Sequence, residues 1–228
     1  MDEAGFLRAT RESYDAVAEV YGEIARDELG ERPLARGMLM AFAEFVRGPV
    51  VEMGAGPGQV AAYLHGLGVD VRGIDLSPAM VALARREHPG VRYDVGSMTE
   101  LGVEDGSLGG LVAWYSLIHI PPELRPEVLA GFHRALAPGG HLLLAFQVGD
   151  GHVHFDAAFG EAVDLDFHRM DPERLEGQLE EAGFEVRASL VRRPEPTTWG
   201  PHEKTPHAHM IARKAPLPGE VPPVPSAP

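Results

Sequence analysis

A glycine-rich turn follows the first strongly apolar segment of the chain, in the sequence VVEMGAGPGQV at residues 50–60. Glycine at every second position leaves a backbone that can lie directly against a ligand. A diphosphate site of the dinucleotide type would have the spacing G-x-G-x-x-G, but Gln59 occupies the position of the third glycine and Pro57 lacks a backbone N–H. We therefore expect the turn to contact an uncharged, flat part of a ligand.

An acidic residue, Asp75, stands at the end of the next predicted strand, VDVRGID. In an open parallel sheet the ligand lies beyond the carboxyl ends of the strands, and the two oxygens of a carboxylate can accept both hydroxyl groups of a ribose. The sequence thus predicts a nucleoside site and gives no evidence for a phosphate. The alternative role of Asp75 is structural, as a neighbour of Ser77, the predicted N-cap of a helix.

His119 is the candidate for acid–base chemistry. It follows the fourth predicted strand in SLIHIPP, and the pKa of a histidine is near neutrality, so it can act as a general base on a hydroxyl or an amine. The alternative is a histidine that only hydrogen-bonds the proline turn and shapes the pocket. His168, in LDFHRM, is a candidate for a second pocket histidine.

Two H-x-H pairs are weaker candidates for a functional role. His152 and His154 form an H-x-H pair near two aspartates, but this spacing matches no known ligand set, so we expect a solvated pair and no metal. His207 and His209 alternate along the last predicted strand and share one face, which we expect to be exposed.

Strands and helices alternate along most of the chain. This pattern predicts an α/β fold with βαβ units and a doubly wound, mostly parallel sheet that is covered on both faces. The predicted strands are residues 48–53, 69–75, 91–95, 109–118, 141–148, 184–191 and 207–213.

Two amphipathic helices precede the first strand, and the second, residues 33–46, would bury one apolar face. The expected residues of this face are Leu34, Met38, Phe42 and Phe45. Residues 148–170 form an irregular stretch that is long enough to be a lid or a substrate loop. The Pro-rich segment 215–228 cannot bury a core, and we expect it to be disordered.

The composition of the chain restricts the classes of binding partner that we expect. The 228 residues fit one domain, and 20 basic against 34 acidic side chains give a net charge of −14, which disfavours nucleic acid and anionic membranes. Cysteine is absent, which excludes disulfides and fits a reducing compartment. The sequence shows neither a targeting segment nor a membrane span. We therefore expect a cytoplasmic protein, monomeric or homodimeric, whose partner is a small-molecule substrate.

Five segments resemble, in order and spacing, those of class I S-adenosylmethionine-dependent methyltransferases, especially the small-molecule enzymes of high-GC bacteria. The segments are VVEMGAGPGQV, VRGIDLSPAMVALAR, VGSMTEL, LVAWYSLIHIPPE and LAPGGHLLLAFQ. The resemblance implies a Rossmann-like, seven-stranded sheet with an antiparallel last strand as a core at residues 49–214. It further implies N-terminal helices, residues 1–48, that cap the pocket, and S-adenosyl-L-methionine as a cofactor that leaves as S-adenosyl-L-homocysteine.

The resemblance also implies roles for single residues. Glu52 would orient the turn or the cofactor's amino group, and Asp75 would hold the ribose. Ser97 stands where many relatives have an aspartate that accepts from the adenine amino group, so that contact would be weaker or made by backbone. The candidate cofactor-binding residues are Tyr14, Glu52, Gly54, Ala55, Gly56, Asp75, Leu76, Ser97, Met98 and Trp114, and the candidate substrate-binding residues are Tyr21, Tyr115 and His168.

The function that the resemblance implies is metal-independent, in-line methyl transfer to a small-molecule acceptor, with His119 as the catalytic candidate. The fourth strand is not followed by the N-P-P-Y or D-P-P-Y signature of enzymes that methylate adenine or glutamine nitrogen. Whether oxygen, nitrogen or carbon is methylated stays open. Two alternatives are an NAD(P)-dependent oxidoreductase and a non-catalytic nucleoside-binding module.

Overall fold

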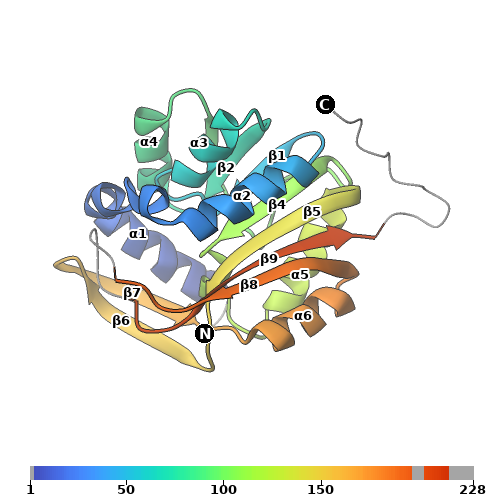
Figure 1. Cartoon of the computed structure of the whole chain (residues 1–228). Coiled ribbons are helices and arrows are strands. Elements are labelled where there is room, and N and C mark those ends of the chain that lie inside the picture. The colour runs from blue at the N-terminus through green and yellow to red at the C-terminus, as the bar shows by residue number, and fades with distance from the viewer. Residues whose placement is uncertain (1–2, 197–202, 216–228) are drawn as a thin grey trace.

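The computed structural model describes residues 3–196 and 203–215, and its centre is a seven-stranded sheet in the order β3-β2-β1-β4-β5-β9-β8 (Figure 1). β9 lies between β5 and β8 and is antiparallel to both, whereas the remaining neighbours pair in parallel. The predicted fold class, with its antiparallel last strand, is confirmed. The strands are β1 (Val50–Met53), β2 (Val71–Asp75), β3 (Arg92–Val95), β4 (Leu108–Trp114), β5 (Leu136–Gln147), β8 (Phe184–Arg192) and β9 (His207–Lys214).

Helices cover both faces of this sheet. α2, α3 and α4 pack on one face and α5 and α6 on the other, as the members of the two large core clusters show. Ser77 and Asp171 accept backbone N–H groups as the N-caps of α4 and α6, and a proline opens each helix. The helices are α1 (Glu3–Ala25), η1 (Glu28–Glu31), α2 (Pro33–Phe45), α3 (Gln59–Gly66), α4 (Pro78–Glu87), η2 (Leu117–His119), α5 (Arg125–Ala135) and α6 (Pro172–Glu181).

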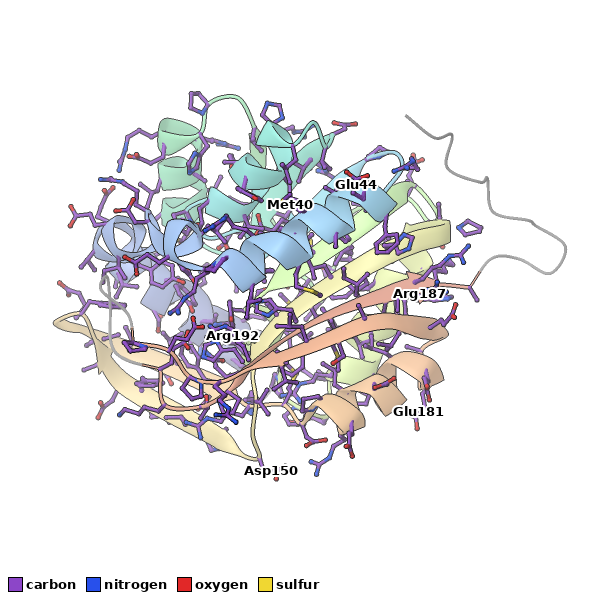
Figure 2. All side chains as sticks on the ribbon, in the orientation of Figure 1. Met40, Glu44, Asp150, Glu181, Arg187 and Arg192 are labelled. Atoms are coloured by element: carbon purple, nitrogen blue, oxygen red, sulfur yellow. The ribbon has the colours of Figure 1, made fainter. Side chains whose placement is uncertain are left out.

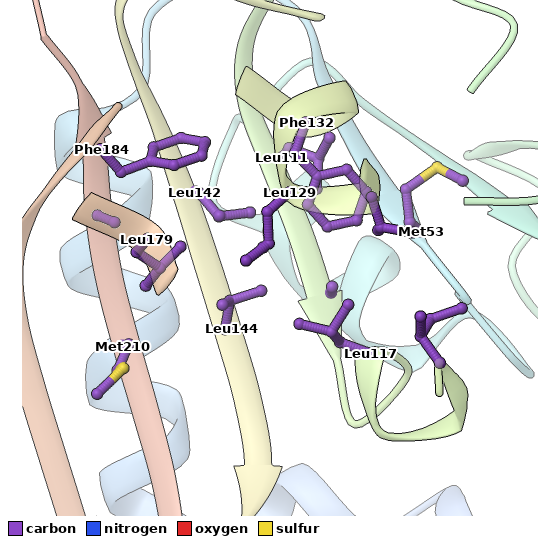
Figure 3. Packing of buried hydrophobic residues seen from close by; sticks show 14 of the residues in the cluster. Met53, Leu111, Leu117, Leu129, Phe132, Leu142, Leu144, Leu179, Phe184 and Met210 are labelled. Atoms are coloured by element: carbon purple, nitrogen blue, oxygen red, sulfur yellow. The ribbon is translucent and has the colours of Figure 1, made fainter. Parts of the chain in front are cut away.

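The core beneath α5 and α6 consists of interlocking aliphatic and aromatic side chains (Figure 3). Leu129 and Phe132 of α5 meet Leu111 and Leu142 of the central strands, and each of these side chains is fully buried. β4 is buried along its whole length because both of its faces are covered, so it reads as a continuous apolar run. This rigid centre holds the loops at the strand ends.

The strand order reverses between β1 and β4, which is where a doubly wound sheet leaves a crevice for a ligand. The glycine turn after β1, Asp75 at the end of β2 and Trp114 at the end of β4 therefore meet at one edge of the sheet. The topology alone brings together three groups that are far apart in the sequence.

Residues 148–170 were expected to be irregular, and this expectation is wrong. They contain a second, two-stranded sheet, formed by β6 (His152–Ala158) and β7 (Glu161–His168) as an antiparallel hairpin. The turn between the strands places Phe159 and Gly160 at φ of 54° and 87°. The hairpin lies beside α1 (Figure 1), and Val17 of α1 packs against Val163 and Leu165.

The buried face of α2 also differs from the prediction. The buried face of α2 consists of Ala35, Met38, Leu39 and Phe42, whereas Leu34 and Phe45 are exposed. The outward face of α2 carries Met40 and Glu44 (Figure 2). Residues 137–140 form an irregularity within β5, whose register against β4 shifts there. Of the predicted tail, residues 216–228 lie outside the described part of the chain.

None of the helices within the described ranges is both long enough and apolar enough to cross a membrane.

Candidate active site

A cavity of about 760 Å³ opens beyond the carboxyl ends of β1, β2 and β4. α1 and the β6–β7 hairpin form its other walls, so that the cavity lies between the sheet edge and these two elements. Twelve of the candidate residues line it, which brings together positions from the first helix to the fourth strand. They are Tyr14, Tyr21, Glu52, Gly54, Ala55, Gly56, Asp75, Leu76, Ser97, Met98, Trp114 and Tyr115, and the candidate base His119 lines it too.

The glycine turn packs against the end of β4. Gly54 has a φ of 72°, and a Cβ atom built on it would lie 2.3 Å from the Cβ of Ser116. Ser116 itself donates from its hydroxyl to the carbonyl oxygen of Met53, at 2.6 Å. Only glycine combines the left-handed backbone with this close approach. Ala55 and Gly56 face the cavity from the same turn.

Asp75 serves the backbone and the cavity at the same time. Its Oδ2 accepts from the Gly56 N–H at 2.7 Å, and its Oδ1 accepts from the Ser77 N–H at 2.8 Å. Burial raises the pKa of Asp75 to about 6, although these backbone donors act in the opposite direction. A carboxylate offers about four lone-pair sites, so two remain for donors on a ligand. The structural role therefore does not exclude the binding role.

Glu52 lies buried in β1 and also reaches the cavity wall. Burial raises the pKa of Glu52 well above its usual range, and a backbone hydrogen bond from Ala61 at the start of α3 opposes this shift. Among the described residues, no group donates to its Oε2. Because a buried acceptor without a donor is costly, this oxygen suits a donor on a bound ligand.

The cavity continues past β3 along Leu76, Ser97 and Met98. The hydroxyl of Ser97 is engaged locally, with the Thr99 hydroxyl at 2.8 Å and as an acceptor of the Thr99 N–H at 3.2 Å. Ser97 therefore holds its own loop, which leaves apolar surface from Leu76 and Met98 for a flat ligand.

His119 is held by two partners. Its Nε2 lies 2.8 Å from the hydroxyl of Tyr14 on α1, and its Nδ1 lies 3.1 Å from the backbone carbonyl of Asp166 on β7. Burial lowers the pKa of His119 to about 4, a shift that the Asp166 carbonyl opposes. His119 is therefore a neutral imidazole at physiological pH, as a general base must be.

The end of β4 presents two large rings to the cavity. Tyr115 has a φ of 51°, a conformation that non-glycine residues rarely adopt and that occurs often at functional sites. Its hydroxyl lies 2.7 Å from Nδ1 of His207, and the ring of Trp114 lies 4.9 Å from that of His209. The expected exposure of these two histidines is therefore wrong: both are buried, because β9 is an interior strand.

His168 lies outside the main cavity. It lines a second crevice of about 20 Å³ together with His119, Thr10, Asp164 and Asp166, and its ring stacks on that of His152. Asp166 accepts from Nδ1 of His154 at 3.1 Å. The described residues contain no group of three or more histidine, aspartate or glutamate side chains arranged to hold a metal ion.

Several residues that line the cavity were not expected from the sequence. Glu28 is one of them, and burial raises its pKa to about 7. Glu203 is another, and it pairs with Arg192 and Arg32, both buried, at 2.5 and 2.9 Å. Figure 2 shows Arg192 and Arg187 toward opposite ends of β8. Glu28 and Arg32 lie far from Arg192 and Glu203 in the chain, and no local motif marks them.

The hairpin and the loop before β9 add a second group of unexpected lining residues. From the hairpin come the aromatic and aliphatic side chains Val153, Phe155, Phe159, Leu165 and Phe167. Lys204 lies exposed at the wall, whereas the Nζ of Lys214 donates to the carbonyls of His133 and Leu136, each at 2.7 Å. The hairpin residues alternate apolar and polar, which was the available signal for a strand.

Comparison with known proteins gives consistent results. Residues 50–140 match the model of a methyltransferase domain family. A demethylmenaquinone methyltransferase of Beutenbergia cavernae is 28% identical over 167 residues, which cover 70% of this chain and 63% of that protein. The corresponding enzyme of Chlorobaculum parvum is 30% identical over 92 residues, only 37% of its length. The matched region thus spans about a third to less than two thirds of these curated relatives.

Solved structures agree with the fold. The 1,6-didemethyltoxoflavin-N1-methyltransferase of Burkholderia thailandensis, which holds S-adenosylhomocysteine, superimposes with a TM-score of 0.69 at 22% identity, over 94% of this chain and 91% of its own. A methyltransferase of Methanosarcina mazei gives a TM-score of 0.67 at 19% identity, over 77% and 97%. The strand order, the glycine turn with Asp75 beside it and these matches show that residues 50–140 form a methyltransferase domain with the fold of the class I S-adenosylmethionine-dependent methyltransferases.

Proposed function

We propose that this chain binds S-adenosyl-L-methionine in the cavity and transfers its methyl group to a small-molecule acceptor. The observation that carries the proposal is the carboxylate of Asp75, which lines the cavity next to the glycine turn with capacity for two further donors. The ribose would lie on Asp75, the adenine along Leu76 and Met98, and the methionine part over the turn, with its ammonium group near Glu52. Tyr14 would close this part of the site from above.

In this proposal the acceptor occupies the space between α1 and the hairpin, lined by Tyr21, Tyr115 and the hairpin's aromatic rings. The segment 148–170 then serves as the substrate element and residues 1–48 as the cap. The sulfonium already activates the methyl group, so the protein's task is to hold donor and acceptor in line in a dry pocket. His119 would take the acceptor's proton where the acceptor is a hydroxyl, without a metal.

Related enzymes point to a similar kind of substrate. The demethylmenaquinone methyltransferases and the 1,6-didemethyltoxoflavin-N1-methyltransferase named above act, according to their names, on demethylmenaquinone and 1,6-didemethyltoxoflavin. The aromatic lining of this cavity would suit a planar, largely apolar acceptor. Its identity, a monomeric or homodimeric state, and a cytoplasmic location remain predictions.

Calorimetry with S-adenosylhomocysteine tests the proposal, with Asp75→Ala as the variant and NAD as the competing ligand. We expect micromolar binding that Asp75→Ala abolishes, and no heat with NAD. Binding of NAD instead would favour an oxidoreductase. Retention of the cofactor without turnover of any acceptor would favour a non-catalytic nucleoside-binding module.

A further inference from the structure

The hydrogen bonds of His119 determine where its proton lies. The carbonyl oxygen of Asp166 can only accept, so the Nδ1 that lies 3.1 Å from it carries the hydrogen. In a neutral ring the other nitrogen, Nε2, then has the free lone pair. The Tyr14 hydroxyl, 2.8 Å away, must therefore donate to Nε2. This assignment follows from the chemistry of the partners.

Both nitrogens of His119 are thus occupied, and an acceptor cannot reach Nε2 without displacing Tyr14. The oxygen of Tyr14 still has lone pairs, and Tyr14 lines the main cavity. A hydroxyl group in that cavity can donate to Tyr14 while Tyr14 donates to His119. The phenol therefore stands between the cavity and the base.

On its other side His119 faces the surface crevice that it shares with Thr10, Asp164, Asp166 and His168. The crevice has a volume of about 20 Å³. This is enough for one water molecule, which needs roughly 10–15 Å³ and two to four polar partners. His119 lines both spaces, so its ring borders a place for water outside the cavity that would hold the product.

We propose that Tyr14 and His119 form a proton relay that takes the proton of a neutral, planar phenolic or enolic hydroxyl. The relay rests on the function proposed above and specifies its acceptor class and the atom that the acceptor touches. Tyr14 is the catalytic residue in contact with the acceptor, His119 is the proton sink, and Asp166 is a positioning residue that acts through its carbonyl.

The hydroxyl oxygen forms a bond to the methyl carbon while the carbon–sulfur bond breaks and its electron pair stays on sulfur, which gives neutral S-adenosylhomocysteine and a methyl ether. The hydroxyl proton passes to the Tyr14 oxygen as the Tyr14 proton passes to Nε2. A sulfonium charge disappears as an imidazolium charge forms, so the buried site keeps its net charge. After the product leaves, the Nε2 proton returns through the Tyr14 hydroxyl to water in the open cavity, which restores the neutral ring with its hydrogen on Nδ1.

The aromatic side of the cavity supports this acceptor class. Rings of Phe6, Phe155, Phe159 and Phe167 line it, and Phe167 packs edge-on against His119 at a centroid distance of 4.8 Å. Aromatic walls around one hydrogen-bonding pair suit a flat molecule with a single hydroxyl.

A pair of acceptors separates catalysis by the relay from a structural role. The probes are 2-naphthol, which is protonated at neutral pH, and a dinitro-naphthol, which is ionised. For Tyr14→Phe and His119→Asn we expect kcat/KM to fall by about 10²–10⁴-fold with 2-naphthol, the range of general acid–base catalysis, but only slightly with the ionised probe, which needs no base. His119→Asn retains a donor for the Asp166 carbonyl. Equal losses with both probes would overturn the relay.

Two control variants remove the same groups elsewhere. Tyr63→Phe and His65→Asn lie on α3 outside the cavity lining, and we expect neither to change the ratio of the two rates. Methylation of aromatic amines or carbon acids with no methylation of either naphthol would overturn the acceptor class. Calorimetry with S-adenosylhomocysteine on His119→Asn keeps the two proposals apart, because the relay can fail while the cofactor still binds.

Nitrogen-15 NMR of the histidine rings tests the relay without any acceptor. In the full chain with S-adenosylhomocysteine we expect His119 to be neutral at pH near 7, with its proton on Nδ1. A proton on Nε2, or a charged ring, would overturn the relay whatever the methylation assays give.

Discussion

The carboxylate of Asp75 accepts hydrogen bonds from the backbone and also lines the cavity. Ligand binding should therefore depend on the protonation state of Asp75. Burial raises its pKa to about 6, whereas an exposed aspartate titrates at about 4. As the pH falls through 6, the folded protein takes up a proton on Asp75, and the carboxyl loses acceptor capacity toward a ribose. Ionised Asp75 is therefore the binding form.

We expect the Kd for S-adenosylhomocysteine to rise about tenfold between pH 7 and pH 5, as follows when only the ionised carboxylate binds. Calorimetry at several pH values measures this. The same shift makes the free energy of unfolding rise as the pH falls from 6 toward about 4, because the folded state binds the extra proton, so Asp75 does not unfold the protein in this window. Asp75→Asn should bind weakly and without this pH dependence; a pH-dependent Asn variant would assign the titration to another group.

At the scale of single elements, α1 is fastened to the core by Asp15. Its Oδ1 accepts from the Ser77 hydroxyl at 2.6 Å and from the Ala79 N–H at 3.0 Å, so it joins α1 to the N-terminus of α4. On the other side of α1, the Ser13 hydroxyl accepts the N–H of Asp164 on the hairpin. α1 thus links the sheet edge to the hairpin and holds Tyr14 over the cavity.

We expect Asp15→Ala to lower the free energy of unfolding by about 1–2 kcal/mol, the usual cost of a lost capping contact, and to weaken binding of S-adenosylhomocysteine. Urea unfolding and calorimetry measure the two effects. Asp15→Asn keeps an oxygen at the same position and should lose less. Glu12→Ala, exposed on the same helix, should change stability by less than about 0.5 kcal/mol. An Asp15→Ala protein as stable as the parent would show that α1 is held by its apolar contacts alone.

The β6–β7 hairpin is stabilised by fewer contacts with the rest of the protein than the central sheet is. β6 is mostly exposed, and a two-stranded hairpin is only marginally stable by itself, so its order depends on contacts such as Leu165 against Val17. We expect its amides to exchange with solvent at least about 100-fold faster than those of β4, because local opening costs less than global unfolding. Leu165→Ala should further accelerate amide exchange in the hairpin and leave the exchange rates of β4 unchanged. Hairpin amides as slow as those of β4 would contradict this view.

The sequence allowed most elements to be predicted, because helices and strands of the core have clear periods and caps such as Ser77. The hairpin was missed because its turn, Phe159–Gly160, is not one of the usual asparagine–glycine pairs. The two-residue repeat of a strand predicted that His207 and His209 share one face. It could not show that β9 lies inside the sheet, between two other strands. The glycine turn, Asp75 and Trp114 could be placed together from the sequence because they stand at or after strand ends, and their role in cofactor binding stays a prediction. The bond between Tyr14 and His119 depends instead on the packing of a helix that is 105 residues away in the chain.

For the whole molecule, the net charge of −14 should distinguish the two forms of the cofactor. S-adenosylmethionine carries one net positive charge and S-adenosylhomocysteine carries none. An acidic protein attracts the first over distances that salt screens, since the Debye length falls from about 30 Å at 0.01 M to about 8 Å at 0.15 M. The protein's field thus favours the substrate form over the product.

We expect the affinity for S-adenosylmethionine to fall a few-fold between these two ionic strengths, while the affinity for S-adenosylhomocysteine stays nearly constant. Calorimetric titration of both at each salt concentration gives the ratio. An equal effect of salt on the two affinities would show that the net charge of the protein does not contribute and that only groups next to the site affect binding.

The placement of the two lysines has a practical consequence. Lys214 is engaged with two backbone carbonyls, whereas Lys204 lies exposed at the cavity wall, and the chain has no other lysine side chain. Of the two lysine side chains, an amine-reactive dye should therefore label Lys204 at the cavity wall in preference to Lys214. Its fluorescence would then report the arrival of any compound, which offers a way to screen acceptor libraries before a product is known.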